Sequence, residues 1–267
     1  MDCLEGMRNM EPGAVDVIVT SPPYNLGVAY RSYQDRRTRD DYLSWCEDWA
    51  AQVHRVLKDE GSLFLNMDAA SGDPTLPMEV MVRLVSKLFR LQNTIHWVKS
   101  ISLPGDDGTI ISRGHFKPIN SRRFLNGCHE YVFHLTKSGN VALDRLAVGV
   151  PYADKSNVGR WEHTNGNDLR CAGNVWFVPY ETIRSRAGER PHPATFPVAL
   201  AERCIKLHGK ARPVVMDPFL GLGATAEAAW NLDAERFVGF EIDSGYANFA
   251  RRRCDRLAKG AKKPDRF

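Results

Sequence analysis

The chain has 267 residues, 43% of them hydrophobic and 25% charged, which is the composition of a globular protein large enough for one α/β domain with an insertion. A net charge of +4 permits a nucleic-acid partner without requiring one. The six cysteines form no C-x-x-C pair, and no signal sequence or membrane-length apolar run is present. These features argue against a zinc protein, a secreted protein and a membrane protein, so we expect a cytoplasmic protein with reduced thiols.

The first predicted strand is the β-branched run 15–20, which is followed by Ser21, Pro22, Pro23 and Tyr24. Because the two prolines cannot donate to a sheet ladder, the strand ends there and continues into a stiff loop. The loop offers the Ser21 hydroxyl, backbone carbonyls with a fixed direction and the aromatic face of Tyr24. This set suits a flat ring that carries a hydrogen-bond donor, such as the exocyclic amine of a nucleobase, although Pro-Pro also occurs in plain turns.

The tetrapeptide Ser21-Pro22-Pro23-Tyr24 after a hydrophobic strand resembles the catalytic motif of amino-methylating DNA methyltransferases, which act on cytosine N4 or adenine N6. The resemblance implies that these four residues are catalytic and that Tyr24 stacks on the target base. It also implies that Asp2, in the acidic turn before the strand, lies near the adenine of the cofactor. A frayed terminal residue is the alternative for Asp2.

Residues 26–138 alternate between predicted strands and helices. A polar loop at 26–41 comes first, and it either closes on substrate or is solvated. Apolar residues at three- and four-residue spacing from Tyr42 to Leu57 indicate an amphipathic helix with an aromatic stripe in the core. The elements expected next are a strand at 61–67, a helix at 78–89, a strand at 93–99 and a strand at 129–135. This alternation predicts a mostly parallel sheet with helices on both faces.

Residues 100–127 form a long predicted loop between the last two of these strands. A loop of this length in a compact domain is usually functional or mobile. It is rich in basic side chains, and those predicted to contact DNA phosphates are Arg113, Lys117, Arg122 and Arg123. A solvated loop is the alternative.

Regular periodicity fades in residues 139–189, where Asn, Arg and Trp are frequent. We expect an insertion that does not build the sheet. Under the resemblance it is the target-recognition region, because arginine and asparagine can read the edges of guanine and adenine. Arg160 and Arg170 are its predicted DNA contacts.

A helix is predicted at 198–207, with Thr195 as its cap and Pro197 in its first turn. The segment before it contains His192 and Thr195. It is similar to a His-Pro segment that lies beside the methionine end of the cofactor in this family. A plain helix start is the alternative.

A strand, a glycine turn and a helix follow at 213–231, and a strand ending in acidic residues lies at 236–243. Glycines allow close backbone approach, and a helix N-terminus favours an anion. A carboxylate at a strand end can accept hydrogen bonds from ribose hydroxyls. By spacing alone the stretch also fits a dinucleotide site, because Gly221, Gly223 and Ala226 match G-x-G-x-x-A.

The sequence Asp217-Pro218-Phe219 before the glycines instead resembles the S-adenosylmethionine motif of the same methyltransferases. A dehydrogenase also offers no role for the tetrapeptide at 21–24. The cofactor-binding residues predicted in this part of the chain are Asp217, Pro218, Phe219, Gly221, Gly223, Thr225 and Glu241.

The order of the motifs, with the catalytic motif first and the cofactor motif last, resembles the permuted β group of amino-methylating enzymes. The resemblance implies a Rossmann-like methyltransferase sheet. It divides the chain into a catalytic part at 1–138, a target-recognition region at 139–189 and a cofactor-binding part at 190–267. It implies transfer of a methyl group from S-adenosylmethionine to N4 of a cytosine flipped out of duplex DNA, at specific sites and without a metal.

Adenine N6 is the first alternative, since serine in the first motif position only favours cytosine. A DNA-binding protein with the same fold and no catalysis is the second. The partner implied is double-stranded DNA. The resemblance also allows a homodimer and a restriction endonuclease of the same restriction-modification system that forms no stable complex with the chain.

Overall fold

The structure is a computed structural model that describes residues 1–28, 30–114, 121–158, 160, 166–180 and 195–260. Its helices are α1 (Cys3–Arg8), α2 (Arg39–Val56), α3 (Leu76–Lys87), the 3-10 helix η1 (Lys155–Asn157), α5 (Val198–His208), α6 (Ala224–Asn231) and α7 (Ser244–Gly260). Its strands are β1 (Val15–Thr20), β2 (Leu57–Met67), β3 (Arg90–Val98), β4 (Ile101–Pro104), β5 (Ile110–Arg113), β6 (His129–Thr136), β7 (Val175–Phe177), β8 (Val214–Asp217) and β9 (Arg236–Gly239). Each helix and strand expected from the sequence overlaps one of these elements.

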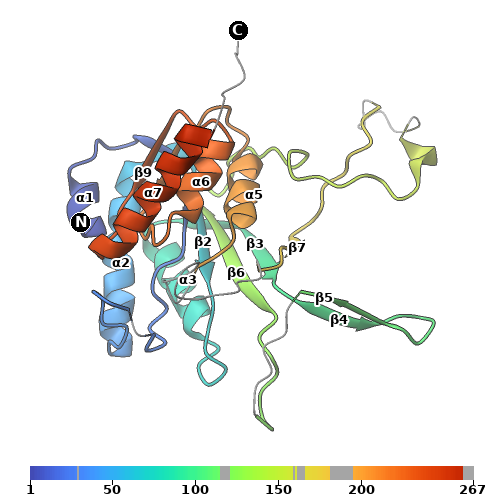
Figure 1. The fold of residues 1–267 in the computed structure, drawn as a ribbon, viewed down its shortest axis with the longest axis horizontal. Coiled ribbons are helices and arrows are strands. Elements are labelled where there is room, and N and C mark those ends of the chain that lie inside the picture. The colour runs from blue at the N-terminus through green and yellow to red at the C-terminus, as the bar shows by residue number, and fades with distance from the viewer. Residues whose placement is uncertain (29, 115–120, 159, 161–165, 181–194, 261–267) are drawn as a thin grey trace.

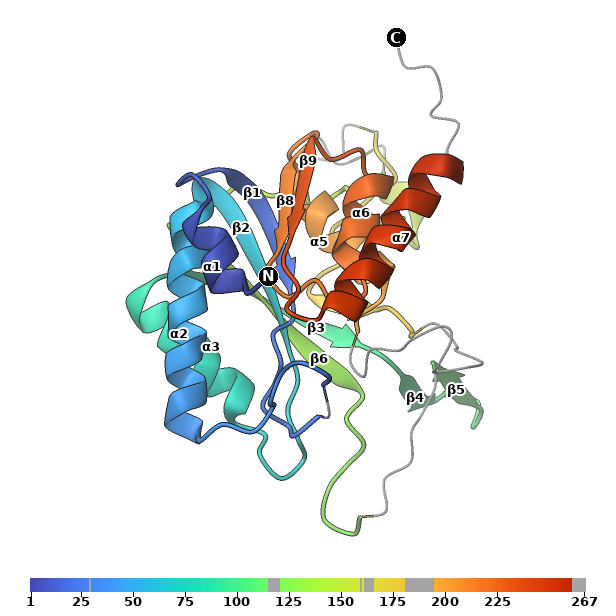
Figure 2. The ribbon, with the colours of Figure 1, turned by 60° about the vertical axis from the view of Figure 1, so that its left-hand side comes forward.

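Seven strands form one sheet in the order β7-β3-β6-β2-β1-β8-β9. Neighbouring strands are parallel except at β6, which runs antiparallel to both β2 and β3. Helices α1, α2 and α3 cover one face of the sheet, and α5, α6 and α7 cover the other (Figure 1 and Figure 2). The predicted Rossmann-like α/β class, with a mostly parallel sheet covered on both faces, is confirmed.

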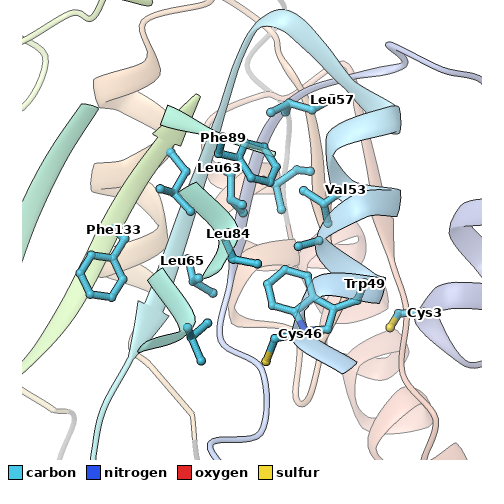
Figure 3. Close-up of a cluster of buried hydrophobic side chains, with 14 of the residues drawn as sticks. Cys3, Cys46, Trp49, Val53, Leu57, Leu63, Leu65, Leu84, Phe89 and Phe133 are labelled. Atoms are coloured by element: carbon cyan, nitrogen blue, oxygen red, sulfur yellow. The ribbon is translucent and has the colours of Figure 1, made fainter. Parts of the chain in front are cut away.

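The sheet separates two hydrophobic clusters, because successive side chains of a strand point to opposite faces. In β1, Ile18 joins the cluster under α1, α2 and α3, whereas Val17 and Val19 join the cluster under α5 and α6. In the first cluster, Trp49 of α2 is fully buried together with strand residues such as Leu63 (Figure 3). With both faces buried, β1 is fixed in the middle of the sheet, and so is the loop that follows it.

The region 139–189 contributes one strand to the sheet, so the prediction that it builds none of the sheet is wrong. Strand β7 pairs in parallel with β3 at the sheet edge. Trp176 of β7 is 2% exposed, and the indole of Trp97 donates to the Val178 carbonyl oxygen at 2.7 Å. A strand of three residues is too short to show a period, which is why the apolar residues there did not predict it.

Part of the loop predicted at 100–127 is a hairpin, so the expectation of irregular structure is wrong there. Strands β4 and β5 pair antiparallel in a separate two-stranded sheet that extends away from the body of the protein (Figure 1). Their turn is closed by Gly105, whose backbone N–H donates to the Thr109 carbonyl oxygen at 2.7 Å. Residues 115–120 lie outside the described part of the chain.

Helix α5 begins at Val198 without a side-chain cap, so the predicted capping by Thr195 is wrong. The N-cap position is taken by Pro197 in an extended conformation. A capping side chain must sit at the N-cap to reach the first free N–H groups, and Thr195 lies two residues before it. Thr195 instead lines the cavity described next.

Candidate active site

A cavity of about 590 Å³ lies where the carboxyl ends of β1, β8 and β9 meet. Its walls include the segments that follow these strands, at 21–24, 218–222 and 240–243. The two predicted motifs meet here because β1 and β8 are neighbours: the Thr20 hydroxyl donates to Asp217 Oδ1 at 2.7 Å across 197 residues of sequence. Ligands of open α/β sheets bind at this edge.

Hydrogen bonds with Tyr42 and Asp35 hold the tip at 21–24 in place. Tyr42 of α2 donates its hydroxyl proton to the Pro23 carbonyl oxygen at 2.7 Å. The buried carboxylate of Asp35 accepts hydrogen bonds at 2.8–3.1 Å from three backbone N–H groups just after the tip. The direction of the tip is therefore set by contacts on both sides of it, in addition to the two prolines.

The Tyr24 hydroxyl oxygen lies 2.6 Å from Ser21 Oγ and also contacts two side chains that the sequence analysis did not single out. Asn66 of β2 donates its Nδ2 proton to it at 2.8 Å, and Tyr24 donates to Glu130 Oε2 of β6 at 3.3 Å. Burial and the nearby Glu130 carboxylate raise the pKa of Tyr24 well above its usual value. Tyr24 is therefore a neutral hydrogen-bonding group at neutral pH.

The turn after β8 is built on Asp217, which is 1% exposed. Its carboxylate accepts hydrogen bonds from the hydroxyls of Thr20 and Thr225 at 2.7 and 2.6 Å and from the Phe219 N–H at 3.0 Å. Burial outweighs these hydrogen bonds and raises the pKa of Asp217 to about 6. Asp217 and Thr225 therefore join β1, β8 and α6 beneath the turn, and neither side chain lines the cavity.

The cavity side of the same turn is formed by Pro218, Phe219 and Gly221. Gly221 and Gly223 have φ values of 52° and 83°, which side chains disfavour. A Cβ atom on Gly223 would also lie 3.0 Å from Ala250 of α7. Gly223 thus allows α7 to pack against the turn, although it does not itself line the cavity.

Glu241, just beyond β9, connects the turn to the far wall of the cavity. Its Oε2 accepts from the Gly221 N–H at 2.9 Å, and its Oε1 accepts from the Asp243 N–H at 2.8 Å. Burial raises the pKa of Glu241 above its ordinary value. Asp2 lines the cavity as well, but its carboxylate also caps α1, accepting from the Leu4 N–H at 2.8 Å.

The predicted aromatic stripe of α2 is divided between the core and the cavity. Tyr42 and Trp49 are fully buried, as expected. Trp45 is half-buried and lines the cavity, with its ring centroid 5.5 Å from that of Phe219. Helical spacing places Tyr42, Trp45 and Trp49 on one face of α2. The sequence therefore does not show which of the three lines the cavity.

The described part of the loop that follows the tip at 21–24 lies against the cavity, and its closing on substrate stays a prediction. Tyr30, Tyr33 and Arg37 line the cavity. Ser32 donates its hydroxyl proton to Asp243 Oδ2 at 2.7 Å, which connects the loop to the end of β9. The loop therefore joins the predicted catalytic and cofactor sides of the site.

The predicted DNA-binding arginines lie away from the cavity. Arg113 ends β5, Arg122 and Arg123 follow the hairpin, and Arg160 and Arg170 lie in the region before β7; all five are exposed and none lines the cavity. Lys117 and His192 are outside the described residues. The DNA contacts and the role of His192 stay predictions.

Within the described residues, no group of three or more His, Cys, Asp or Glu side chains could hold a metal ion. In the same residues, no helix combines the length and the apolar character that crossing a membrane requires.

The sequence profile of the N6/N4 family described as DNA methylase matches residues 15–252. This span includes the tip at 21–24, the glycine turn and Glu241. The chain belongs to the DNA methylase family and is a DNA methyltransferase of the kind that methylates amino groups. S-adenosylmethionine is the methyl donor of this family, which confirms the predicted cofactor.

Alignments with individual relatives cover most of the chain. The chain is 29% identical over 261 residues to the type II methyltransferase M.ScaI of Streptomyces caespitosus, and the alignment covers 93% of this chain and 78% of the relative. It is 25% identical over 261 residues to the DNA adenine methyltransferase YhdJ of Escherichia coli strain K12, covering 95% and 81%. The solved PvuII DNA methyltransferase, which is cytosine-N4-specific, has a TM-score of 0.70 at 18% identity and covers 97% of this chain and 88% of that one. At this identity the structural likeness shows the fold alone.

We expect Glu241→Ala to weaken the binding of S-adenosylmethionine by about tenfold to a hundredfold, the range for losing a charged hydrogen-bond acceptor. Glu241 holds the turn and faces the cavity, whereas Glu235 is exposed at the start of the same strand segment. Glu235→Ala is therefore the matched control. Titration calorimetry with the cofactor measures both variants, and an unchanged Kd for a folded Glu241→Ala protein would remove Glu241 from the site.

Proposed function

We propose that this DNA methyltransferase transfers the methyl group to the exocyclic N4 amine of a cytosine that is flipped out of duplex DNA. The proposal rests on Ser21, a neutral hydroxyl at the head of a rigid tip, in the same cavity as Glu241 and the glycine turn. The amine is a poor nucleophile because its lone pair is delocalised into the ring, and inside a duplex it cannot be reached. The site must therefore hold the base outside the helix and free that lone pair.

The residues of the tip are suited to this task. Ser21 Oγ and the Pro22 carbonyl oxygen accept the two amine hydrogens, which favours a pyramidal nitrogen with its lone pair directed at the methyl group. The ring of Tyr24 offers a stacking surface for the base. Because Tyr42 and Asp35 fix the tip, these acceptors are positioned before the substrate arrives, which is how positioning and electrostatics lower a barrier.

The residues present also fit the cofactor. S-adenosylmethionine supplies an activated methyl group on a sulfonium sulfur. Each carboxylate oxygen of Glu241 accepts one backbone N–H and keeps a lone pair for a ribose hydroxyl. Phe219 and Trp45 provide an apolar wall, and a volume of about 590 Å³ is typical of a small-molecule site.

We propose that the residues before β7 set the methylated DNA sequence, because they hold exposed Arg160 and Arg170 and because their described part has little regular structure. Since β7 belongs to the sheet, the segment to exchange with another DNA methylase is 139–173. The exchange is expected to change the methylated sequence while the chimera keeps its thermal stability and cofactor affinity. An active chimera that still methylates the original sequence would place recognition elsewhere, with 100–127 as the next candidate.

Adenine N6 is the second candidate, favoured by the similarity to YhdJ, which is a DNA adenine methyltransferase. Both bases present an amine beside a ring-nitrogen acceptor. Incubation with duplex DNA and S-adenosylmethionine, followed by mass spectrometry of the nucleosides, separates the candidates. N4-methyldeoxycytidine is the expected product. N6-methyldeoxyadenosine alone would support the second candidate, and no methylated nucleoside would contradict both. The homodimer and the partner restriction endonuclease stay predictions.

A further inference from the structure

We infer that Glu130 is a positioning residue for methyl transfer, which acts through the Tyr24 hydroxyl to turn the lone pairs of Ser21 Oγ toward the target amine. The inference rests on the proposed function, since it concerns the same amine. Glu130 does not line the cavity and belongs to neither of the sequence motifs. The inferred role belongs to a charged side chain that contacts the Tyr24 hydroxyl from outside the cavity wall.

Glu130 is a buried carboxylate with a full set of partners. It is 5% exposed, and its Oε1 accepts hydrogen bonds from Lys99 Nζ at 3.0 Å and from the Tyr180 hydroxyl at 2.9 Å. Its Oε2 accepts from Asn66 Nδ2 at 2.7 Å and from the Tyr24 hydroxyl at 3.3 Å. Burial alone would lower the pKa of Lys99, but the Glu130 and Asp68 carboxylates outweigh burial and raise it. A cation is thus held beside the carboxylate.

This arrangement fixes the direction of the Asn66 amide. Its Nδ2 group faces both Glu130 Oε2 at 2.7 Å and the Tyr24 hydroxyl oxygen at 2.8 Å. The opposite orientation would place the amide oxygen against a carboxylate, which can only accept. The observed orientation is kept although Asn66 Oδ1 has no hydrogen-bond partner among the described residues. The carboxylate therefore decides which way the amide points.

The direction of the two hydroxyl protons follows. The Tyr24 oxygen accepts a proton from Asn66, and its own proton is drawn to the negatively charged acceptor, Glu130. Ser21, 2.6 Å away, is then the donor to the Tyr24 oxygen. The Ser21 proton is then directed at the Tyr24 oxygen, and the free lone pairs of Ser21 Oγ can accept an amine hydrogen.

The reverse direction shows why the charge matters. If Tyr24 donated to Ser21, the Ser21 proton would be free to point at the incoming amine, and two donors would face each other. A neutral side chain at position 130 leaves both directions open. The Glu130 carboxylate excludes donation from Tyr24 to Ser21 before the base binds. Ser21 is thus preorganised as a hydrogen-bond acceptor.

The test is the single-turnover rate of methyl transfer from labelled S-adenosylmethionine to mixed-sequence duplex DNA. Glu130→Gln keeps the shape and removes the charge. We expect it to lower this rate by about tenfold to a hundredfold, the range for a hydrogen bond to a charged group, with unchanged Kd for cofactor and for DNA. Asp16→Asn is the matched control, because Asp16 is also a buried carboxylate paired with two lysines, Lys58 and Lys210, but at the other end of β1. It should keep the wild-type rate.

A double-mutant cycle with Tyr24→Phe separates this role from a structural one. Without the Tyr24 hydroxyl the connection to Ser21 is cut, so adding Glu130→Gln should reduce the rate by less than about twofold further. Fully additive losses, or a folded Glu130→Gln protein at the wild-type rate, would overturn the inference. If Glu130→Gln alone fails to fold, Glu130→Gln with Lys99→Met removes both charges together and enters the same cycle. A wild-type protein that methylates no DNA would contradict the proposed function instead.

Discussion

Replacing Tyr24 by alanine is expected to slow single-turnover methyl transfer to DNA by more than about a hundredfold, because the change removes two contributions at once. The first is the ring, since stacking on a base is worth about 1–3 kcal/mol. The second is the hydroxyl, which lies 2.6 Å from Ser21 and connects it to Glu130. Tyr24→Phe keeps the ring, so its expected loss is only about tenfold.

Three measurements on both variants distinguish these contributions: the thermal melting temperature, the cofactor Kd and the single-turnover rate. Both variants should keep the wild-type cofactor Kd, because the contacts of Glu241 and the glycine turn do not involve Tyr24. A phenylalanine variant as slow as the alanine variant would show that the hydroxyl carries the whole effect and that stacking contributes nothing. A fall in melting temperature and cofactor affinity together would show that Tyr24 is a packing residue.

The parts of the site that the sequence predicts are those whose chemistry is local. The run at 15–20 has the β-branched residues of a buried strand, and prolines must end it, so strand and tip can be read together. The turn at 217–225 needs glycines for its positive φ values and sits between a strand and a helix. In both stretches neighbouring residues determine the conformation.

The Asn66–Glu130 contact could not be predicted in the same way, because it depends on the order of strands in the sheet. Glu130 lies near the start of β6 and Asn66 near the end of β2. They meet only because β6 is inserted antiparallel beside β2, which brings the start of one strand to the end of the other. A mostly parallel sheet was expected from the alternation of elements, and that expectation does not identify which strand is reversed.

A similar limit explains why the sequence motif predicts Asp217 as a cofactor ligand. The motif places it directly before Pro218 and Phe219, which do line the cavity. Asp217 is the last residue of β8, however, and its carboxylate contacts Thr20 and Thr225 beneath the turn. Whether its charge also acts on the cofactor is a separate question that substitution can answer.

Asp217→Ala is expected to lower the free energy of unfolding at pH 7 by about 2–4 kcal/mol, since it leaves buried donors without an acceptor. These donors are the hydroxyls of Thr20 and Thr225 and the N–H of Phe219. The turn above them should deform, and cofactor binding should weaken as well. Asp217→Asn should do neither, because Thr225 can accept from the new amide and donate its own proton to the Val19 carbonyl oxygen, 3.4 Å away.

Wild type and Asp217→Asn, which have side chains of the same shape at this position, should differ in how their stability depends on pH. Burial raises the pKa of Asp217 from 3.8 to about 6, so the folded state holds this proton more tightly than the unfolded state. The stability from this group is therefore fully present below about pH 4 and is lost as pH rises through about 6. A shift of this size corresponds to about 3 kcal/mol, which asparagine cannot show because it does not titrate.

Urea unfolding of wild type and Asp217→Asn from pH 3 to pH 7 measures this difference directly. The stability of the variant relative to wild type should increase by about 3 kcal/mol over that range, and other titrating groups cancel in the comparison. Equal pH dependence in the two proteins would mean that Asp217 is not a buried carboxylate. A well-folded Asp217→Asn protein that fails to bind S-adenosylmethionine would show that the charge itself contacts the cofactor, as the motif suggested. Retained affinity would instead make Asp217 the support on which the cofactor turn is built.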